Sequence, residues 1–424
     1  MSDFAIRGIE VHQIGVFENF KLEFPEKEDP EKAEIHIFTG ENGSGKSTLL
    51  SILAATIYPS LFQKIILPKL ARSINASYKG TSHSLKVNLC GYNIGPVTLE
   101  NTPKELIEYN NSILTIPESN ELTFAFFAYS GYRRVEAINL TGIQEIQQLP
   151  LANALDFNKS INPQIILQWI ANMKSSEYMA IAKNKTLPGN QSKMLKMVEE
   201  VISEVIEKNL TFDFDENPFR VVVIIEGLQM SFDTLPDGLK SIISWIADLL
   251  MRMQRIRWKD NIPVFERRFI LFLDEIEVHL HPAWQRKVLP IIQKLFKNAQ
   301  IFISTHSPFV VGSVDGAWIY RLKFDGKKTT VAPPTLSEDG ESFVSILKEI
   351  FDVKEQFGQA VEKELDAFYQ MKTKTLQSME LEDLELMEIM ADNIKGQSAE
   401  LDLIVEMEMR QIFRQFSQSD SYLK

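Results

Sequence analysis

The chain has 424 residues, 44% of them hydrophobic, which suits one large domain with appended subdomains and a substantial core. Its single cysteine, Cys90, excludes a disulfide framework and a cysteine-rich zinc site and favours a reducing, cytoplasmic location. The net charge of −12 argues against a general nucleic-acid coat, and we expect neither a signal peptide nor a membrane span, because no apolar run is long enough.

Strand-like alternation over residues 4–24 predicts two N-terminal strands, and a charged loop with two prolines follows. An apolar run over residues 35–39 predicts a buried strand, and residues 48–55 predict a helix. Between them, Gly40 to Ser47 read Gly-Glu-Asn-Gly-Ser-Gly-Lys-Ser and match the phosphate-binding motif G-x-x-x-x-G-K-[ST]. The strand–loop–helix context that the motif requires is therefore present.

The residue types of this loop predict its chemistry. Its glycines let backbone N–H groups surround an anion, and the helix adds the positive end of its dipole. Lys46 is expected to reach the β- and γ-phosphates, and the Ser47 hydroxyl to ligate Mg²⁺. Phe17 either flanks the adenine or belongs to the core, and we favour the core. The predicted nucleotide-binding residues of the loop are Gly40, Asn42, Gly43, Ser44, Gly45, Lys46, Ser47 and Thr48.

The middle of the chain predicts two insertions. Short strand-like runs with turn signals over residues 78–130 indicate an inserted antiparallel β subdomain that ends in a buried strand. The arginines that follow, Arg133 and Arg134, either lie beside nucleotide or DNA phosphates or form a solvated pair. Residues from about 160 to 210 predict a helical insert whose heptads are too short for an extended coiled-coil arm.

Two later strands predict where catalytic side chains lie. The apolar residues 269–273 end in Asp274 and Glu275, which is typical of a central parallel strand that delivers carboxylates to the edge holding the phosphate loop. Asp274 is expected to hold Mg²⁺ through water beside Ser47, and Glu275 to orient and deprotonate the attacking water. The next strand leads to His306, whose neutral imidazole is expected to contact the γ-phosphate or the attacking water.

These motifs and the segment 235–241, in this order, resemble the ATP-binding-cassette (ABC) and SMC-like ATPases. The runs at 274–282 and 304–308 are similar to the bacterial group that includes overcoming-lysogenization-defect ATPases and the ATPase subunits of anti-phage systems, with the Septu ATPases (PtuA) most alike. The resemblance covers roughly residues 1–325. It implies an α/β fold with a P-loop head of the ABC/SMC type, to which the sequence patterns add inserted antiparallel β and helical subdomains and an all-helical C-terminal region.

The resemblance also implies a head-to-tail homodimer that sandwiches two ATP molecules. Each phosphate loop would face segment 235–241 of the other copy, where Asp237 and Gly238 are expected to contact the nucleotide. Pro236 and Asp237 replace the serine and the first glycine of the usual Leu-Ser-Gly-Gly signature, so hydrolysis is expected to be slow unless Asp237 turns away to cap its helix as the N-cap residue. Residues 130–133 stand where the group usually has a glutamine.

Two other clusters have competing interpretations. Glu277, His279 and His281 are a weak candidate zinc site, whereas the resemblance makes His281 and Pro282 the start of a helix, which we prefer. Six basic residues either line a DNA groove or form a solvated face, and we favour the solvated face. They are Arg252, Arg255, Arg257, Lys259, Arg267 and Arg268.

A second domain is expected at residues 336–424, after a head at 1–335. From Val353 onward its predicted helices carry 15 acidic against 8 basic residues and several methionines. These helices either pack on themselves or, as we prefer, assemble the chain or dock a partner. The Toprim nuclease pattern that overcoming-lysogenization-defect enzymes carry is missing, so we expect no nuclease activity in this chain.

Together these observations predict an ATPase, with ATP and Mg²⁺ as cofactors, that controls a separate nuclease subunit in an anti-phage complex. The Septu resemblance implies an HNH nuclease. The alternative is a DNA-repair or SMC-like clamp on DNA ends. The lack of long heptad repeats argues against this alternative. A transporter ATPase is disfavoured by the degenerate signature, the missing glutamine and the acidic tail. The sequence does not specify the trigger, the oligomer size, or whether ATP hydrolysis activates or restrains the nuclease.

Overall fold

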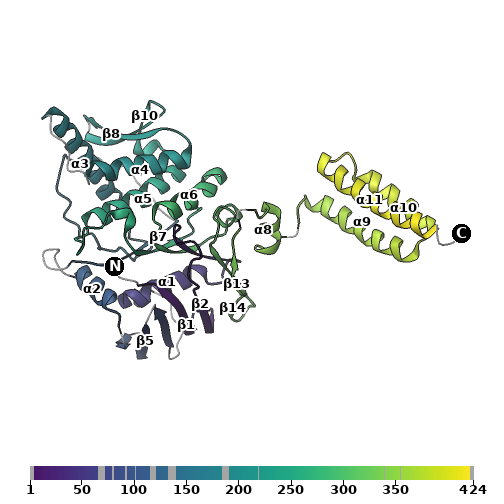
Figure 1. The fold of residues 1–424 in the computed structure, drawn as a ribbon, viewed down its shortest axis with the longest axis horizontal. Helices are drawn as coiled ribbons and strands as arrows, with labels where there is room; N and C mark the ends of the chain where they lie inside the picture. Colours follow the sequence, from purple (N-terminus) through teal and green to yellow (C-terminus); the bar gives the residue numbers. More distant parts are fainter. Residues whose placement is uncertain are drawn as a thin grey trace. The chain divides into compact units, whose positions relative to one another are not determined.

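The computed structural model divides into two compact units, Met1–Ile346 and Leu347–Lys424, later in the chain than the expected boundary at 335/336 (Figure 1). No helix in the described residues is both long and apolar enough to cross a membrane. The described residues are 4–64, 72–78, 81–90, 93–100, 102–114, 121–131, 140–183, 191–217, 219–338, 340–353 and 355–420.

The larger unit is built on a mainly parallel sheet in the order β14-β13-β3-β12-β11-β7, with β15 beside β13. Strands β3, β12 and β11 and the edge strand β7 are almost entirely buried, as expected when both faces of a parallel sheet are covered. In register, Asp274 lies beside Ser304, and Ser304 lies beside Phe38, so the carboxyl ends of three strands share one edge. The strands are β3 (Glu34–Gly40), β7 (Ala125–Ser130), β11 (Phe269–Asp274), β12 (Gln300–Ser304), β13 (Trp318–Phe324), β14 (Thr329–Val331) and β15 (Thr335–Leu336).

A second, antiparallel sheet has the order β2-β1-β4-β5-β6. The expected β subdomain is therefore not separate, because its strands extend the N-terminal hairpin and begin before residue 78. The buried strand at its expected end, β7, pairs with β11 in the parallel sheet instead. The strands of the second sheet are β1 (Ile6–Ile14), β2 (Phe17–Glu23), β4 (Arg72–Tyr78), β5 (Thr81–Cys90) and β6 (Asn93–Glu100).

Residues Lys104–Leu114, expected to be strand-like, form helix α2. Leu106 and Tyr109 are both buried and three residues apart, which is a helical spacing. The prediction is wrong because it treats Asn110-Asn111 as a turn signal. The Tyr109 hydroxyl donates to the carbonyl oxygen of Phe126 at 2.8 Å. This contact packs α2 against β7.

The helical insert is confirmed by α3 and α4. Figure 1 shows α3, α4 and α5 gathered with β8 and β10 on one side of β7, and α1 on the other side. The helices are α1 (Lys46–Ile57), α3 (Pro163–Ala182), α4 (Gln191–Ile206), α5 (Asp237–Arg255), α6 (Pro282–Leu295) and α7 (Pro308–Val311), with short 3-10 helices at Pro59–Lys64, Phe232–Thr234 and Val264–Glu266. The small sheet β10-β9-β8 comprises β8 (Leu210–Glu216), β9 (Phe219–Ile225) and β10 (Leu228–Ser231).

Three residues of the expected basic face are used inside the fold. Arg252 is 2% exposed and pairs with Asp248, which also accepts a hydrogen bond from the Tyr129 hydroxyl at 2.8 Å. Arg255 donates to two backbone carbonyls of the segment before α3. Arg267 is buried and stacks on an indole ring 4.1 Å away. For these three residues both sequence interpretations, DNA groove and solvated face, are wrong, because Arg252 and Arg267 form ion pairs and Arg255 donates to backbone carbonyls within the fold.

The smaller unit is a helical bundle. Its apolar core includes Phe368 of α9, Met387 of α10 and Val405 of α11, all fully buried. A hydrogen bond from Lys372 to Glu408 joins α9 to α11. The described residues of this unit form helices only, which agrees with the expected all-helical region. They are α9 (Gln359–Ser378), α10 (Leu381–Ile394) and α11 (Ala399–Asp420); α8 (Phe343–Glu349) crosses the division between the units.

Candidate nucleotide-binding and hydrolysis site

The loop between β3 and α1 has the backbone conformation that an anion cradle needs. Gly40, Gly43 and Gly45 have φ values of 142°, 83° and 97°, in the region that favours glycine. Helix α1 begins at Lys46 with no side-chain cap, so no side chain competes for its first amides. A Cβ added to Gly43 would meet nothing within 4 Å, which leaves open space above the loop.

Neighbouring strands hold this loop in place. A Cβ on Gly40 would lie 2.1 Å from the carbonyl oxygen of Leu322, its neighbour on β13. The Thr329 hydroxyl donates to the Ser44 carbonyl oxygen at 2.8 Å. Phe17 is buried, and its ring would lie 2.8 Å from a Cβ on Gly45. Phe17 is therefore a core residue that supports the loop from behind, as the favoured interpretation had it.

The structure brings the expected metal ligands together from distant parts of the chain. The Ser47 hydroxyl donates to Asp274 Oδ1 at 2.8 Å, although 227 residues separate them. The same oxygen accepts a hydrogen bond from the hydroxyl of Ser304 on β12, the strand between β3 and β11. Serine and aspartate oxygens are ligands that Mg²⁺ prefers, so this pair fits the ion.

Glu275 lies where β11 leaves the sheet. Its φ is 51°, and its N–H donates to the carbonyl oxygen of Ser304 at 3.0 Å. On its other side, a Cβ on Gly131 would lie only 2.1 Å from the Glu275 carbonyl oxygen. Burial raises the pKa of Glu275, the neighbouring Asp274 raises it further, and Lys46 opposes the shift. A raised pKa suits a proton acceptor working near neutral pH.

Lys46 and His306 share the electrostatic field of these carboxylates. Lys46 Nζ donates to the carbonyl oxygens of Gly40 and Glu41 at 2.9 and 3.0 Å. Burial lowers its pKa, while Glu275 and Asp274 oppose the shift. Burial and the positive charge of Lys46 lower the pKa of His306, while Asp274 opposes the shift, and the lowered pKa favours the neutral imidazole.

The expected signature segment begins α5. Asp237 is inside the first turn, with Pro236 at the N-cap position, so the expectation that Asp237 caps the helix is wrong. Its side chain is 76% exposed and lies 3.5 Å from Lys240 Nζ, where it is favoured by the positive helix end. A Cβ on Gly238 would lie 2.4 Å from the His279 carbonyl oxygen. The segment therefore packs against the turn that follows Glu275.

The side chains of the candidate zinc cluster face different partners. His281 Nδ1 accepts from the Ala283 N–H at 3.2 Å and caps α6, so it starts a helix as preferred. Glu277 accepts a hydrogen bond from the His306 N–H. The described residues contain no group of three or more His, Cys, Asp or Glu side chains that could hold a metal ion. Arg133 and Arg134 lie outside the described residues.

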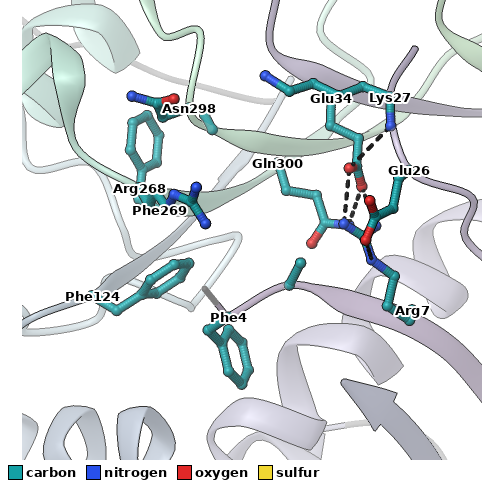
Figure 2. A pocket seen from close by; sticks show the side chains of 12 residues that line it. Phe4, Arg7, Glu26, Lys27, Glu34, Phe124, Arg268, Phe269, Asn298 and Gln300 are labelled. Atoms are coloured by element: carbon teal, nitrogen blue, oxygen red, sulfur yellow. Dashed lines mark hydrogen bonds and ion pairs between the residues drawn. The ribbon is translucent and has the colours of Figure 1, made fainter. Parts of the chain in front are cut away.

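A pocket of about 130 Å³ lies at the opposite, amino-terminal edge of the sheet (Figure 2). Its charged groups already have partners: Arg7 binds Glu34 at 2.6 Å, Gln300 donates to Glu34 at 2.5 Å, and Lys27 donates to three backbone carbonyls. Burial opposes ionisation of Glu34, but hydrogen bonds and charge from His36 and Arg7 outweigh it and lower the pKa of Glu34 to about 2. Because burial lowers the pKa of His36, Arg7 is the main charged partner. The polar side chains of this pocket therefore bind one another and stabilise the fold.

Parts of this chain are similar in sequence to known proteins. The family described as "AAA domain, putative AbiEii toxin, Type IV TA system" matches residues 176–312, which include Asp274, Glu275 and His306. The Retron Ec83 probable ATPase of Escherichia coli is 31% identical over 137 residues, 32% of this chain and 25% of the relative. The Septu protein PtuA of Bacillus mycoides (strain KBAB4) is 23% identical over 348 residues, 82% of this chain and 44% of the relative. Over these stretches the chain is similar to an AAA domain and to proteins named as a retron ATPase and as the Septu protein PtuA.

The chain spans less than half the length of the relatives that it matches. A solved Smc head bound to the C-terminal winged-helix domain of ScpA is 12% identical, with a TM-score of 0.47 over 78% of this chain and 97% of that one. In the structure Asp274 ends β11, Glu275 follows it and His306 follows β12, at the strand ends where the sequence predicts these residues. Sequence reasoning assigned no role to Ser304, which lies beside Asp274 in register, or to Thr329, because only the strand pairing brings these residues to the site.

Proposed function

We propose that this chain binds and hydrolyses ATP with Mg²⁺. The main observation behind this proposal is the hydrogen bond between Ser47 and Asp274. It joins the start of α1 to the end of β11, beside Glu275. Ser47 and Asp274 would hold Mg²⁺, which when bound offsets the charge of the phosphate oxygens. The Ser44 hydroxyl is buried and has no hydrogen-bond partner among the described residues, which fits a loop built for an anion.

The catalytic roles follow from charge and position. Lys46 supplies positive charge at the end of the loop, and Glu275 accepts a proton from the attacking water. Neutral His306 is able to accept or donate a hydrogen bond at the same edge. Asp237 and Gly238 would contact the nucleotide bound by the second copy in a head-to-tail homodimer. The exposed carboxylate of Asp237 would repel phosphate there, so we infer slow turnover.

We further propose that the chain is the regulatory ATPase of an anti-phage defence complex and controls a separate nuclease. The names of the Septu and retron relatives support this role. The smaller unit would provide assembly or docking, since it exposes apolar side chains on acidic helices: Leu386 and Ile389 of α10, and Leu403 and Met407 of α11. The DNA-clamp alternative loses support, because Arg252, Arg255 and Arg267 are engaged inside the fold.

The hydrolysis proposal is tested with Glu275→Gln and Lys46→Ala. Glu275→Gln keeps the shape of the site but removes the base, so phosphate release should fall ~10²- to 10⁴-fold while ATP stays bound. Light scattering should then show an ATP-dependent dimer. Lys46→Ala should lose ATP affinity in calorimetry, which separates binding from chemistry. Unchanged turnover in Glu275→Gln would refute the base assignment.

The partner proposal needs a separate measurement. The tagged chain is purified from cells that express its genomic neighbours and weighed by native mass spectrometry with and without ATP. A stoichiometric nuclease bound to several ATPase copies is the expected result. A lone ATP-dependent dimer that retains DNA would instead favour the DNA-clamp alternative.

A further inference from the structure

The turn after Glu275 contains a second glutamate that the proposed chemistry does not use. Glu277 Oε1 accepts a hydrogen bond from the backbone N–H of His306 at 2.5 Å, although 29 residues separate them. Its other carboxylate oxygen, Oε2, is buried. A charged acceptor makes a shorter and stronger hydrogen bond than a neutral one, so this contact restrains the backbone of His306 more than an ordinary loop contact would.

The turn itself has a demanding conformation. Glu275 and His279 have φ values of 51° and 65°, which non-glycine residues rarely adopt. Backbone hydrogen bonds from Val278 to Glu275 and from Leu280 to Glu277 close it. Glu277 therefore projects from a closed turn whose first residue is the proposed base.

A second contact ties the same two segments together. The Ser307 hydroxyl donates to Gln285 Oε1 at 2.5 Å, and Gln285 Nε2 donates to the Leu280 carbonyl oxygen at 2.8 Å. The loop that follows β12 is thus linked, at His306 and at Ser307, to the segment that starts with Glu275. The contact of Ser307 is to a neutral amide, so the contact of Glu277 is the stronger restraint.

We propose that Glu277 is a positioning residue that fixes His306 relative to Glu275 at the nucleotide edge. This inference rests on the ATP hydrolysis proposed above. The carboxylate holds the backbone from which the imidazole projects, while the turn that carries it sets the place of the base. Burial raises the pKa of Glu277, and the hydrogen bond from the His306 N–H opposes this shift because it favours the charged carboxylate. Two catalytic groups from different strands thereby share one support.

Kinetics distinguish positioning from binding. Glu277→Ala removes the acceptor, and kcat for ATP should fall ~10- to 100-fold, a typical cost of losing a supporting hydrogen bond, with KM changed less than about threefold. Glu277→Gln keeps an acceptor oxygen at the same place, so it should recover most of the activity. Glu204→Ala, an exposed glutamate on α4, is the matched control and should match the unmodified chain.

A measurement independent of turnover follows the hydrogen bond itself. In the full chain labelled with ¹⁵N-histidine, six histidines give up to six backbone amide signals, and His306→Gln identifies the signal of His306 by its loss. That amide proton should move upfield in Glu277→Ala and less in Glu277→Gln, since an amide oxygen is the weaker acceptor. If Glu277→Ala does not fold, the shift in Glu277→Gln still tests the contact.

The outcomes separate this inference from the proposed function. An unmoved His306 amide in both variants overturns the positioning role, whatever the kinetics show. Equal loss of kcat in Glu277→Ala and Glu277→Gln also overturns it, because the charge would then act on the chemistry directly. If the unmodified chain hydrolyses no ATP, the proposed function fails, while the amide shift still decides whether Glu277 holds His306.

Discussion

Two glycines of the phosphate loop provide a matched test of how the loop is held. Gly40 and Gly43 both have positive φ, so alanine strains the backbone at either position. They differ in their surroundings. A Cβ on Gly40 would lie 2.1 Å from the Leu322 carbonyl oxygen, whereas a Cβ on Gly43 would meet nothing within 4 Å. The clash at Gly40 is with backbone in the neighbouring strand β13, which side-chain rotation cannot relieve.

The magnitudes follow from these contacts. Gly43→Ala should cost only the left-handed backbone strain, about 1–2 kcal/mol. Gly40→Ala adds overpacking of about 1–3 kcal/mol to a backbone strain of about 1–3 kcal/mol, for a total of about 2–6 kcal/mol. Gly40→Ala should therefore lower the free energy of unfolding more than Gly43→Ala does. It should also increase the separation of β13 and β3 at the end of β3 that leads into the loop.

Urea unfolding followed by tryptophan fluorescence measures this difference. All five tryptophans lie in the larger unit, so the signal reports the unit that carries the loop. The midpoint multiplied by the urea slope gives each free energy of unfolding. If Gly40→Ala proves no more destabilising than Gly43→Ala, the idea that β13 restrains the phosphate loop through this contact is wrong.

Two further predictions concern the rest of the molecule. A chain ending after residue 352 should keep ATP binding but lose any assembly beyond a dimer, because the smaller unit is compact by itself; an unchanged mass in light scattering would show that the bundle is only a cap. Glu34 should stabilise the fold above about pH 5 and lose this contribution as the pH falls toward 2, because its pKa is lowered from 4.5 to about 2 in the folded chain. Its contribution at neutral pH is up to about 3 kcal/mol, and Glu34→Gln should flatten the acid limb of the stability curve. An acid limb that is the same with and without Glu34 would contradict this assignment.

Local chemistry explains why so much of the site was predictable from the sequence. Binding phosphate at a loop demands glycines, a lysine and a hydroxyl at close spacing, so Gly40–Ser47 carry their function within a few residues. A buried parallel strand needs a continuous apolar run, and its end fixes where Asp274 and Glu275 emerge. The place of His306 after the next such run follows from the same rule.

Tertiary structure alone decided which distant residues meet. The hydrogen bonds of Asp274 to Ser47 and Ser304 depend on the strand order β3-β12-β11, which no local pattern states. The use of Arg252 inside the fold depends on Asp248 and on carbonyls about 100 residues earlier. Helical and strand periods describe only neighbours along the chain, whereas the partners of charges, hydroxyls and carboxylates are set by packing. For that reason the sequence predicted the candidate catalytic groups, and the structure showed which residues hold them in place.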